Sequence, residues 1–340
     1  MGDNRLVAVR SRALLAAVVL LAAGCAGGDG SETNVAETVT PEPRWVRLQP
    51  GGATSCARGG SYSFWLRRAD PAKLVIFFQG GGGCWDAETC APGSDWFDDA
   101  VDEGDNPLYQ RGIFDFDRPD NPFRDWSFVF IPYCTGDIYT GTREFDHGFY
   151  TVRHFGRTNA EAALARTFER FRDPRQVLVT GCSAGSVGAA VHAARVLATY
   201  RRVDVAVLGD SLTLPFERPL DLSLAGGPRG FSAESLMRGL AQEYPEATFA
   251  RFNYASDAIQ ERFDTAVQPS QKPFEDRLRA SEARLKQLAN YRSYLACGTE
   301  HCVLPDPAFY SLTVGGVRVR DWAADLADGR DVGCPTCPGR

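Results

Sequence analysis

The sequence is poor in histidine, with four residues of this type, and it contains no run of basic residues. Proteins that bind nucleic acid present basic stripes interleaved with aromatic side chains, so we exclude a nucleic-acid partner. No Gly-x-Gly-x-x-Gly follows the first expected strand, and no Gly-Lys-Ser or Gly-Lys-Thr loop occurs. Both patterns are typical of nucleotide binding. We therefore expect no nucleotide cofactor.

The chain begins with the features of an export signal. Residues 13–23 are uncharged, mostly apolar and too short to cross a bilayer comfortably. Three basic residues precede this run: Arg5, Arg10 and Arg12. Small residues then lead to Cys25, as a lipoprotein signal peptidase requires. We expect residues 1–24 to be removed and Cys25 to carry a lipid; the alternative is an ordinary secretory signal cleaved nearby.

The expected exported protein consists of a tether and one domain. Residues 25–43 are rich in small and polar types and are typical of a flexible linker. Residues 44–340 are enough for a single α/β catalytic domain. The signal carries three arginines and one aspartate, so its removal changes the net charge from −6 to about −8. We expect a cell-envelope lipoprotein that meets the membrane only through its anchor, or else a secreted soluble protein.

Nine cysteines follow Cys25, and export predicts that most of them pair. Because the number is odd, at least one is free or pairs outside the chain. Short spacing favours two loop disulfides, Cys84–Cys90 and Cys297–Cys302. A third short pair, Cys334–Cys337, reads as a small disulfide in the C-terminal tail rather than as a redox or zinc motif, because no second Cys or His pair has zinc-finger spacing.

Residues 181–185 read Gly-Cys-Ser-Ala-Gly and lie between an apolar run at 177–179 and an Ala/Val-rich run at 187–197. A strand, a sharp turn with Ser183, and a helix form a nucleophile elbow in serine hydrolases. The two glycines allow the strained backbone of the serine and the close approach of strand and helix. The elbow predicts that Ser183 is a catalytic nucleophile; a structural Gly-rich turn is the alternative.

A second Gly-rich segment follows the apolar run at 73–78. Four consecutive glycines, 80–83, end what we expect to be a buried central strand. Such a segment turns backbone N–H groups toward a ligand, and in α/β-hydrolases it supplies part of the oxyanion hole. Residues 86–125 are long, polar and aromatic, and we expect them to cross the carboxyl edge of the sheet and to form part of a substrate cleft.

The remaining pattern alternates strands and helices. We expect further strands at 126–131, 203–208 and 247–254, with an opening pair within 45–66. Helical spacing predicts helices at 159–171, 232–242 and 274–295. This alternation indicates an α/β fold of the α/β-hydrolase type, with a mostly parallel central sheet and helices on both faces.

A serine hydroxyl needs a neighbouring imidazole to take its proton, and a carboxylate must orient that imidazole. His192 lies in the helix that leaves the elbow, about 13 Å along it at ~1.5 Å per residue. His147 and His154 precede the nucleophile. His301 alone fits the chain order of nucleophile, acid and base that α/β-hydrolases use. We expect His301 to be the base. This acyl-transfer chemistry requires no other cofactor and no metal.

Two carboxylates compete for the role of the acid. Asp210 and Asp257 each follow an expected strand after the elbow, at the edge where catalytic loops gather. Each could also be a helix N-cap. Spacing and composition do not separate them.

Four segments together resemble the pectin acetylesterase/Notum family of serine esterases, over roughly residues 50–325. They are the Gly-rich loop 78–85, the elbow 181–185, the Asp-Ala-Ile-Gln segment 257–260 and the His-Cys pair 301–302. The resemblance implies that Ser183 is the nucleophile, Asp257 the acid and His301 the base. It also implies oxyanion donors on the backbone of Gly81, Gly82 and Ala184. Here a fourth glycine and Cys84 precede Trp85, which departs from the pattern of the family.

The favoured function is that of an exported carboxylic ester hydrolase, an O-acetylesterase acting on acetylated polysaccharide. Six aromatic residues could stack on sugars or could simply pack in the protein: Trp85, Trp96, Phe97, Tyr109, Phe114 and Phe116. The same triad could instead serve a lipase, a protein deacylase or a polyester depolymerase, which would need a deep apolar pocket. A surface-binding lipoprotein without activity is the alternative from another class.

Overall fold

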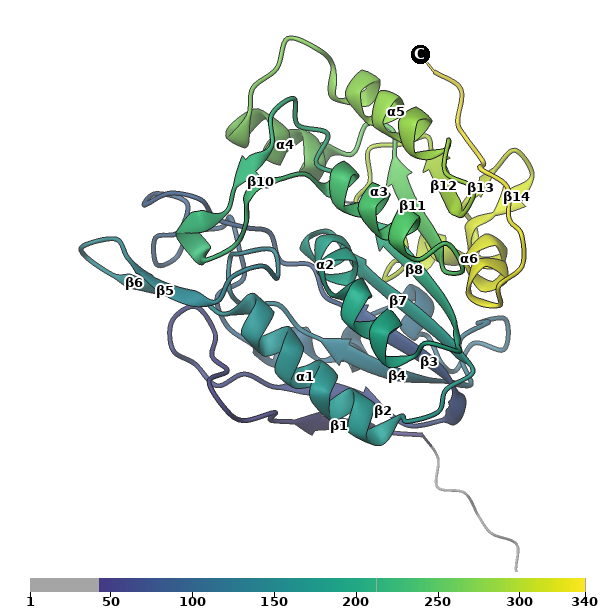
Figure 1. The fold of residues 1–340 in the computed structure, drawn as a ribbon, viewed down its shortest axis with the longest axis horizontal. Coiled ribbons are helices and arrows are strands. Elements are labelled where there is room, and N and C mark those ends of the chain that lie inside the picture. Colours follow the sequence, from purple (N-terminus) through teal and green to yellow (C-terminus); the bar gives the residue numbers. More distant parts are fainter. Residues whose placement is uncertain (1–42, 212, 340) are drawn as a thin grey trace, which may run out of the picture. The chain divides into compact units, whose positions relative to one another are not determined.

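The apolar runs form one eight-stranded sheet in the computed structural model, which describes residues 43–211 and 213–339 (Figure 1). In spatial order the strands are β1 (Trp45–Leu48), β2 (Phe64–Arg67), β4 (Trp126–Ile131), β3 (Asp70–Phe78), β7 (Gln176–Cys182), β8 (Asp204–Asp210), β11 (Thr248–Tyr254) and β12 (Tyr291–Ala296). The strands from β4 to β12 are mutually parallel, whereas β2 is antiparallel to both of its neighbours. The carboxyl ends of the parallel strands therefore meet at one edge, which we call the catalytic edge.

Helices cover both faces of the sheet, as expected. The helices are α1 (Gly156–Arg170), α2 (Ala184–Thr199), α3 (Ala233–Glu243), α4 (Ala258–Val267), α5 (Phe274–Leu285) and α6 (Val319–Ala327). Three two-stranded hairpins complete the strands: β5 (Arg143–Asp146) with β6 (Thr151–His154), β9 (Leu220–Asp221) with β10 (Arg229–Phe231), and β13 (Thr313–Val314) with β14 (Val317–Arg318). Short 3-10 turns lie at η1 (Glu103–Asp105), η2 (Pro107–Tyr109), η3 (Gly112–Phe114), η4 (Ser223–Ala225) and η5 (Pro307–Tyr310).

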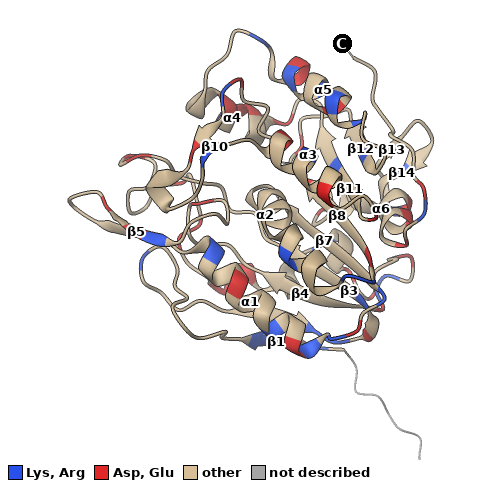
Figure 2. Ribbon diagram, in the orientation of Figure 1, with Lys and Arg blue, Asp and Glu red and all other residues tan. Residues whose placement is uncertain are grey.

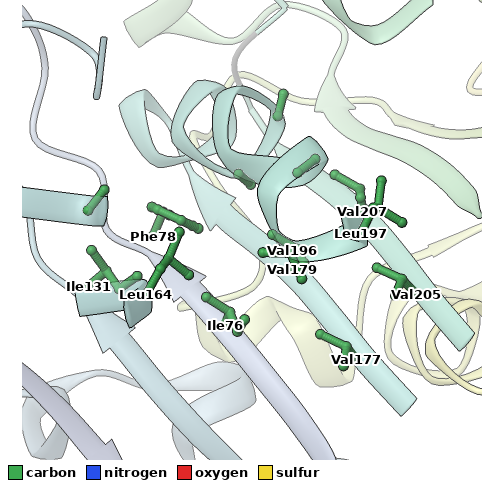
Figure 3. Packing of buried hydrophobic residues seen from close by; sticks show 14 of the residues in the cluster. Ile76, Phe78, Ile131, Leu164, Val177, Val179, Val196, Leu197, Val205 and Val207 are labelled. Carbon is green, nitrogen blue, oxygen red and sulfur yellow. The ribbon is translucent and has the colours of Figure 1, made fainter. Parts of the chain in front are cut away.

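The core has two layers because alternate strand residues point to opposite faces. Ile76 and Val179 face α1, α2 and α3, and Figure 3 shows this packing. Phe77 and Leu178 face α6 and the segment around η3. The buried members of both clusters begin at Phe64, and Leu48 and Trp45 of β1 pack against them.

The helix expected over 274–295 is wrong in its second half. Helix α5 ends at Leu285, and the residues from Tyr291 form the edge strand β12, paired in parallel with β11. Asn290 fixes the turn between them, because its side-chain amide donates to the carbonyls of Ala241 and Ala247 at 3.1 and 2.9 Å. Five of the six residues of β12 are buried, so the sequence after Asn290 gives no alternation that would have indicated an edge strand.

Four disulfides occur among the described residues: Cys56–Cys134, Cys84–Cys90, Cys182–Cys302 and Cys297–Cys337. The expected Cys84–Cys90 pair is confirmed, whereas Cys297–Cys302 and Cys334–Cys337 are wrong. The tail runs beside β12 and exchanges backbone hydrogen bonds with Leu295, which brings Cys337 to Cys297. Cys334 is left as a free thiol.

The expected signal peptide at 1–24, the lipidation site Cys25 and nearly all of the tether 25–43 lie outside the described residues. Within the described part of the chain, no helix is long and apolar enough to span a membrane.

Candidate active site

Ser183 occupies the turn between β7 and α2, as the elbow pattern predicts. Its backbone has φ of 55° and ψ of −124°, a conformation that costs a non-glycine residue about 1–3 kcal/mol. The flanking glycines are required by space. A side chain on Gly181 or Gly185 would run into the carbonyl of Phe78 at the end of β3. The turn therefore pushes the serine side chain out of the sheet at the catalytic edge.

His301 and Asp257 lie in direct contact. Nδ1 of His301 is 2.9 and 2.8 Å from the two carboxylate oxygens of Asp257. A carboxylate can only accept, so the imidazole carries its proton on Nδ1 and keeps the lone pair of Nε2 free. Nε2 is buried and has no hydrogen-bond partner among the described residues. The ring is therefore set to accept a proton at Nε2.

Asp257 is also the N-cap of α4. Its carboxylate accepts the backbone N–H groups of Ile259 and Gln260 at 3.0 and 2.9 Å. The side-chain amide of Gln260 donates to the other oxygen at 3.0 Å. Asp257 is fully buried, so these donors compensate for the loss of water around its charge. The helix cap and the contact with His301 are thus made by one carboxylate.

Asp210 binds the backbone of the loop that carries His301 instead of contacting the imidazole ring of His301. Its Oδ2 accepts the backbone N–H groups of Val303 and Leu304 at 2.9 and 2.7 Å, and its Oδ1 accepts the hydroxyl of Ser211 at 3.0 Å. Complete burial raises the pKa of Asp210 to about 6, although these donors oppose the shift. The two candidates for the acid, which spacing left equal, therefore occupy different environments.

A disulfide links the turn that carries Ser183 to the loop that carries His301. Cys182 precedes Ser183, Cys302 follows His301, and their Cα atoms are 5.7 Å apart. The ring nitrogen of His301 that comes closest lies within 4.8 Å of both sulfur atoms. The bond brings together residues that are 120 positions apart in the chain.

The other three histidines occupy structural positions. His192 stacks on Phe78 with ring centroids 5.6 Å apart, and burial lowers its pKa to about 3, so it stays neutral. His154 is fully buried with Nδ1 2.8 Å from the carbonyl of Thr135. His147 stacks against Tyr150 in the β5–β6 hairpin. The role of His301 as the base stays a prediction.

The three backbone N–H groups expected to bind an oxyanion lack a partner within the described residues. In the described part of the chain, the amides of Gly81, Gly82 and Ala184 have no acceptor. Gly81 and Gly82 have φ of 147° and 74°, and side chains on them would clash with Tyr133 and with the backbone of Trp96. Ala184 begins α2, whose dipole adds positive potential at this point. The geometry is compatible with all three of the expected donors.

A cavity of about 450 Å³ opens at Ser183. Its walls are predominantly apolar and come from Ile138, Leu214, Phe216, Pro219, Leu220, Leu222, Leu224, Ala225, Phe263 and Val267, while Gly82 to Trp85 and Ala184 lie at its catalytic end. A cavity of this size lies in the range of small-molecule sites. Most of the walls come from the segment after β8 and from α4, not from residues 86–125 as expected.

The six aromatic residues proposed for sugar stacking separate into groups. Trp85 and Trp96 meet edge to face at 5.0 Å, and Phe263 of α4 packs against both. Phe114 and Phe116 instead pack below the sheet on Phe128. Phe97 is also buried, whereas Tyr109 is exposed. Only Trp85 and Trp96 of the six lie close to the cavity.

The cavity-lining leucines were missed by sequence analysis. The segment 214–225 contains two prolines and is typical of an irregular loop, and nothing in its spacing indicates that its apolar residues share one wall. Four leucines within eleven positions of a surface loop were the available signal, because loops of that kind are usually polar.

Two groups of described residues have the spacing of metal ligands: Cys84, Cys90 and His154, and Cys182, His301 and Cys302. In each group the two cysteines form a disulfide with each other. A sulfur in a disulfide is not a thiolate, which is the form that binds metal. Neither group therefore offers a metal site.

Comparison with known proteins gives one family match and two similar proteins. Residues 46–212 match the family described as pectinacetylesterase. The chain is similar to palmitoleoyl-protein carboxylesterase notum2 of Xenopus laevis, at 27% identity over 168 residues, or 46% of this chain and 34% of that protein. It is also similar to pectin acetylesterase 5 of Arabidopsis thaliana, at 28% identity over 128 residues, or 35% of this chain and 28% of the other. The matched segments thus span about a third of the length of these relatives.

The fold matches solved structures over most of its length. A crystal structure of the Wnt deacylase Notum from Drosophila superposes with a TM-score of 0.59 at 18% identity, covering 86% of this chain and 96% of that one. The α/β-hydrolase fold is therefore of the Notum type. The family match contains Ser183 and ends before Asp257 and His301, whose placement comes from the tertiary structure.

Proposed function

Since this chain belongs to the pectinacetylesterase family through residues 46–212, we propose that it is a serine carboxylesterase with a Ser183–His301–Asp257 triad. The contact of 2.8 Å between His301 and the buried carboxylate of Asp257 supports these roles, as does the strained turn at Ser183. The free Nε2 of His301 is the atom that would take the serine proton.

The proposed reaction has two acyl-transfer steps. Oγ of Ser183 attacks the ester carbonyl while Nε2 of His301 takes the hydroxyl proton and returns it to the leaving alcohol. Asp257 stabilises the imidazolium that forms. A water molecule, activated by the same imidazole, then releases the acid. Backbone N–H groups of Gly81, Gly82 and Ala184 bind the oxyanion, and one such donor is typically worth about 3–4 kcal/mol of the barrier.

The apolar cavity at Ser183 carries the proposal for the acyl group. An acetyl group would leave most of about 450 Å³ unfilled, whereas an alkyl chain would displace water from leucine and phenylalanine side chains. Each buried methylene contributes about 0.8 kcal/mol. We therefore expect an acyl chain longer than acetyl, which favours the lipase or protein-deacylase alternative over the O-acetylesterase.

The alcohol portion of the substrate is constrained by charge. Residues 86–105 follow the Gly-rich loop and contain eight acidic residues and no basic one. Asp95 and Asp99 pair with arginines, and the other six carboxylates have no ion-pair partner among the described residues. This negative rim repels polyanions such as demethylated pectin. A neutral carbohydrate, a protein or a lipid alcohol fits the rim better.

An acetylated neutral polysaccharide is the second candidate. Trp85 lines the cavity, and its partner Trp96 carries the guanidinium of Arg262 at 4.2 Å from its ring. Paired indole rings at a cleft can stack on sugar rings. The family match is to pectinacetylesterases, which keeps the acetyl substrate in consideration.

A series of p-nitrophenyl esters from acetate to palmitate, followed by acetylated xylan, tests these proposals on residues 43–340. We expect kcat/KM to rise about fourfold per added methylene until the cavity is full, which is 0.8 kcal/mol converted to a rate ratio. The Ser183→Ala variant serves as the blank. A maximum at acetate would favour the polysaccharide acetylesterase. No turnover of any ester, together with no labelling of Ser183 by a fluorophosphonate, would refute the esterase and favour the binding lipoprotein.

A further inference from the structure

Exposed arginines gather at the edge of the sheet opposite the catalytic edge. We call this group the basic edge; it consists of Arg68, Lys73, Arg170, Arg172, Arg175, Arg201 and Arg202. These residues lie where β2, α1 and α2 end and where β3 and β7 begin, and Figure 2 shows their blue segments around the ends of α1 and α2. The six arginines are exposed, and Lys73 is half-buried.

The arginines of the basic edge lack acidic partners. Among the described residues, seventeen other arginines form ion pairs, but none of these six does. The guanidinium groups of four of them contact backbone carbonyls instead, as Arg68 does with Arg170 at 2.8 Å and Arg201 with Ala198 at 3.2 Å. Each keeps further N–H donors directed to solvent.

Acidic residues in the same region do not neutralise it. Four carboxylates are close neighbours of these basic residues in the chain: Asp70, Glu169, Asp173 and Asp204. Asp125 and Asp328 lie at the same edge, beside Asp70 and Gln176, and they pair with Arg124 and Arg330. Asp70 is occupied by the backbone N–H of Ala72 at 2.8 Å, and Glu169 pairs with Arg166. The basic edge therefore keeps a positive excess in a chain whose overall charge is −6.

The molecule thus has charge of opposite sign at its two edges. The acidic rim at 86–105 adjoins the catalytic edge, and the basic edge lies at the other end of the same strands. Strand β7 has seven residues, which at ~3.3 Å per residue separates the edges by roughly 20 Å. This distance is more than twice the Debye length of about 8 Å at physiological salt, so each edge acts on its own surroundings.

The chain that precedes the described residues is joined at the basic edge. Trp45 begins β1 and pairs in register with Arg67, the neighbour of Arg68. Because β1 runs parallel to β4, its first residue lies at the same edge as the starts of the central strands. The segment with the expected lipidation site, Cys25, is therefore attached where the positive charge is concentrated.

We propose that the basic edge docks on an anionic phospholipid surface and turns the catalytic edge away from it. Clusters of four to eight basic side chains next to a membrane attachment bind anionic lipid with about 1 kcal/mol for each Lys or Arg near the surface. In the reverse orientation the acidic rim would face the anionic lipid and be repelled by it. The esterase then draws its substrate from the surroundings rather than from the bilayer beneath it. This inference does not depend on the identity of the ester.

Vesicle co-sedimentation tests the docking with residues 43–340, which lack any lipid anchor. We expect binding to vesicles of equal phosphatidylcholine and phosphatidylglycerol, none to phosphatidylcholine alone, and loss of binding between 0.05 and 0.5 M salt. The double variant Arg172→Gln/Arg202→Gln should bind roughly thirtyfold more weakly, since two contacts are lost. The matched control Arg111→Gln/Arg229→Gln removes the same charge elsewhere and should bind within about threefold of the unchanged chain.

Two results would overturn the proposal. One is equal binding of the unchanged chain to vesicles with and without phosphatidylglycerol. The other is an equal loss of binding in the two double variants, which would show that net charge and not the basic edge is responsible. Binding to polygalacturonate but not to vesicles would assign the basic edge to an anionic polysaccharide and would likewise refute docking on lipid. Circular dichroism of each variant confirms that it is folded.

Discussion

Cys182 and Cys302 join the two loops on which Ser183 and His301 stand. Each cysteine is the direct chain neighbour of a proposed catalytic residue, and the disulfide closes a loop of 120 residues. Asp210 reinforces the same junction through the backbone of Val303 and Leu304. The relative position of nucleophile and base is therefore held by a covalent bond and by a buried carboxylate.

Removal of this disulfide should reduce both stability and activity. By the chain-entropy relation, Cys182→Ser/Cys302→Ser should lose about 3–5 kcal/mol of unfolding free energy. Its kcat should fall by at least tenfold, because a displacement of about 1 Å at the base is costly. Denaturant unfolding and steady-state kinetics on one ester measure the two effects.

The matched control is Cys297→Ser/Cys337→Ser, which removes a disulfide with a separation of 40 residues. The same relation gives this variant a comparable loss of stability, but its kcat should stay close to that of the unchanged enzyme. Equal kcat in both double variants would show that Cys182–Cys302 does not position the active site.

The two aspartates should differ in kinetics. In Asp257→Asn the amide cannot stabilise the imidazolium, so kcat should fall by about three to four orders of magnitude with little change in KM. In Asp210→Asn the amide oxygen can still accept the N–H groups of Val303 and Leu304, and kcat should fall by less than about tenfold. A larger loss in Asp210→Asn than in Asp257→Asn would reverse the assignment of the acid.

Asp210 should make stability depend on pH. Its pKa is raised from 3.8 to about 6 by burial, so between these values the folded state holds a proton that the unfolded state has released. Through Asp210 the unfolding free energy should therefore fall by about 3 kcal/mol as the pH rises from about 4 to 6. Burial also raises the pKa of Asp98 to about 6, so urea unfolding at several pH values should show a decline that is smaller by this amount in Asp210→Asn than in the unchanged chain. A parallel decline in both would assign it to other groups.

A bulky side chain in the cavity should shorten the preferred acyl chain. Leu222→Trp places an indole on the cavity wall, so hydrolysis of the octanoyl ester should fall by at least tenfold while hydrolysis of the acetyl ester is retained. Leu108→Trp changes an exposed leucine outside the cavity and should leave both rates unchanged. If Leu222→Trp reduced both esters equally, the cavity would not be the acyl site.

Local pattern was sufficient to predict the architecture. The continuous apolar runs before Gly80 and Gly181 predict buried parallel strands, and those strands form as β3 and β7. The helix after Ser183 also forms, because the glycines and the Ala-rich run that specify it lie close together in the chain. The helix expected up to Leu295 failed because β11 offers a free edge to Tyr291–Ala296, and this partner is more than 35 residues away in the chain.

The sequence by itself determined the strained turn at Ser183, the Gly-rich loop beside it and the alternation of strands and helices, since each depends on neighbouring residues. Only the tertiary structure decided which carboxylate meets His301, which cysteine pairs with Cys182, and where the apolar cavity beside Ser183 lies. Asp210 is the last residue of β8, whereas Asp257 lies three residues after the end of β11 and caps α4, and it is the fold of the loop from 297 to 304 that brings His301 to Asp257. Contacts of this kind depend on packing between segments that are far apart in the chain, and local periodicity carries no record of them.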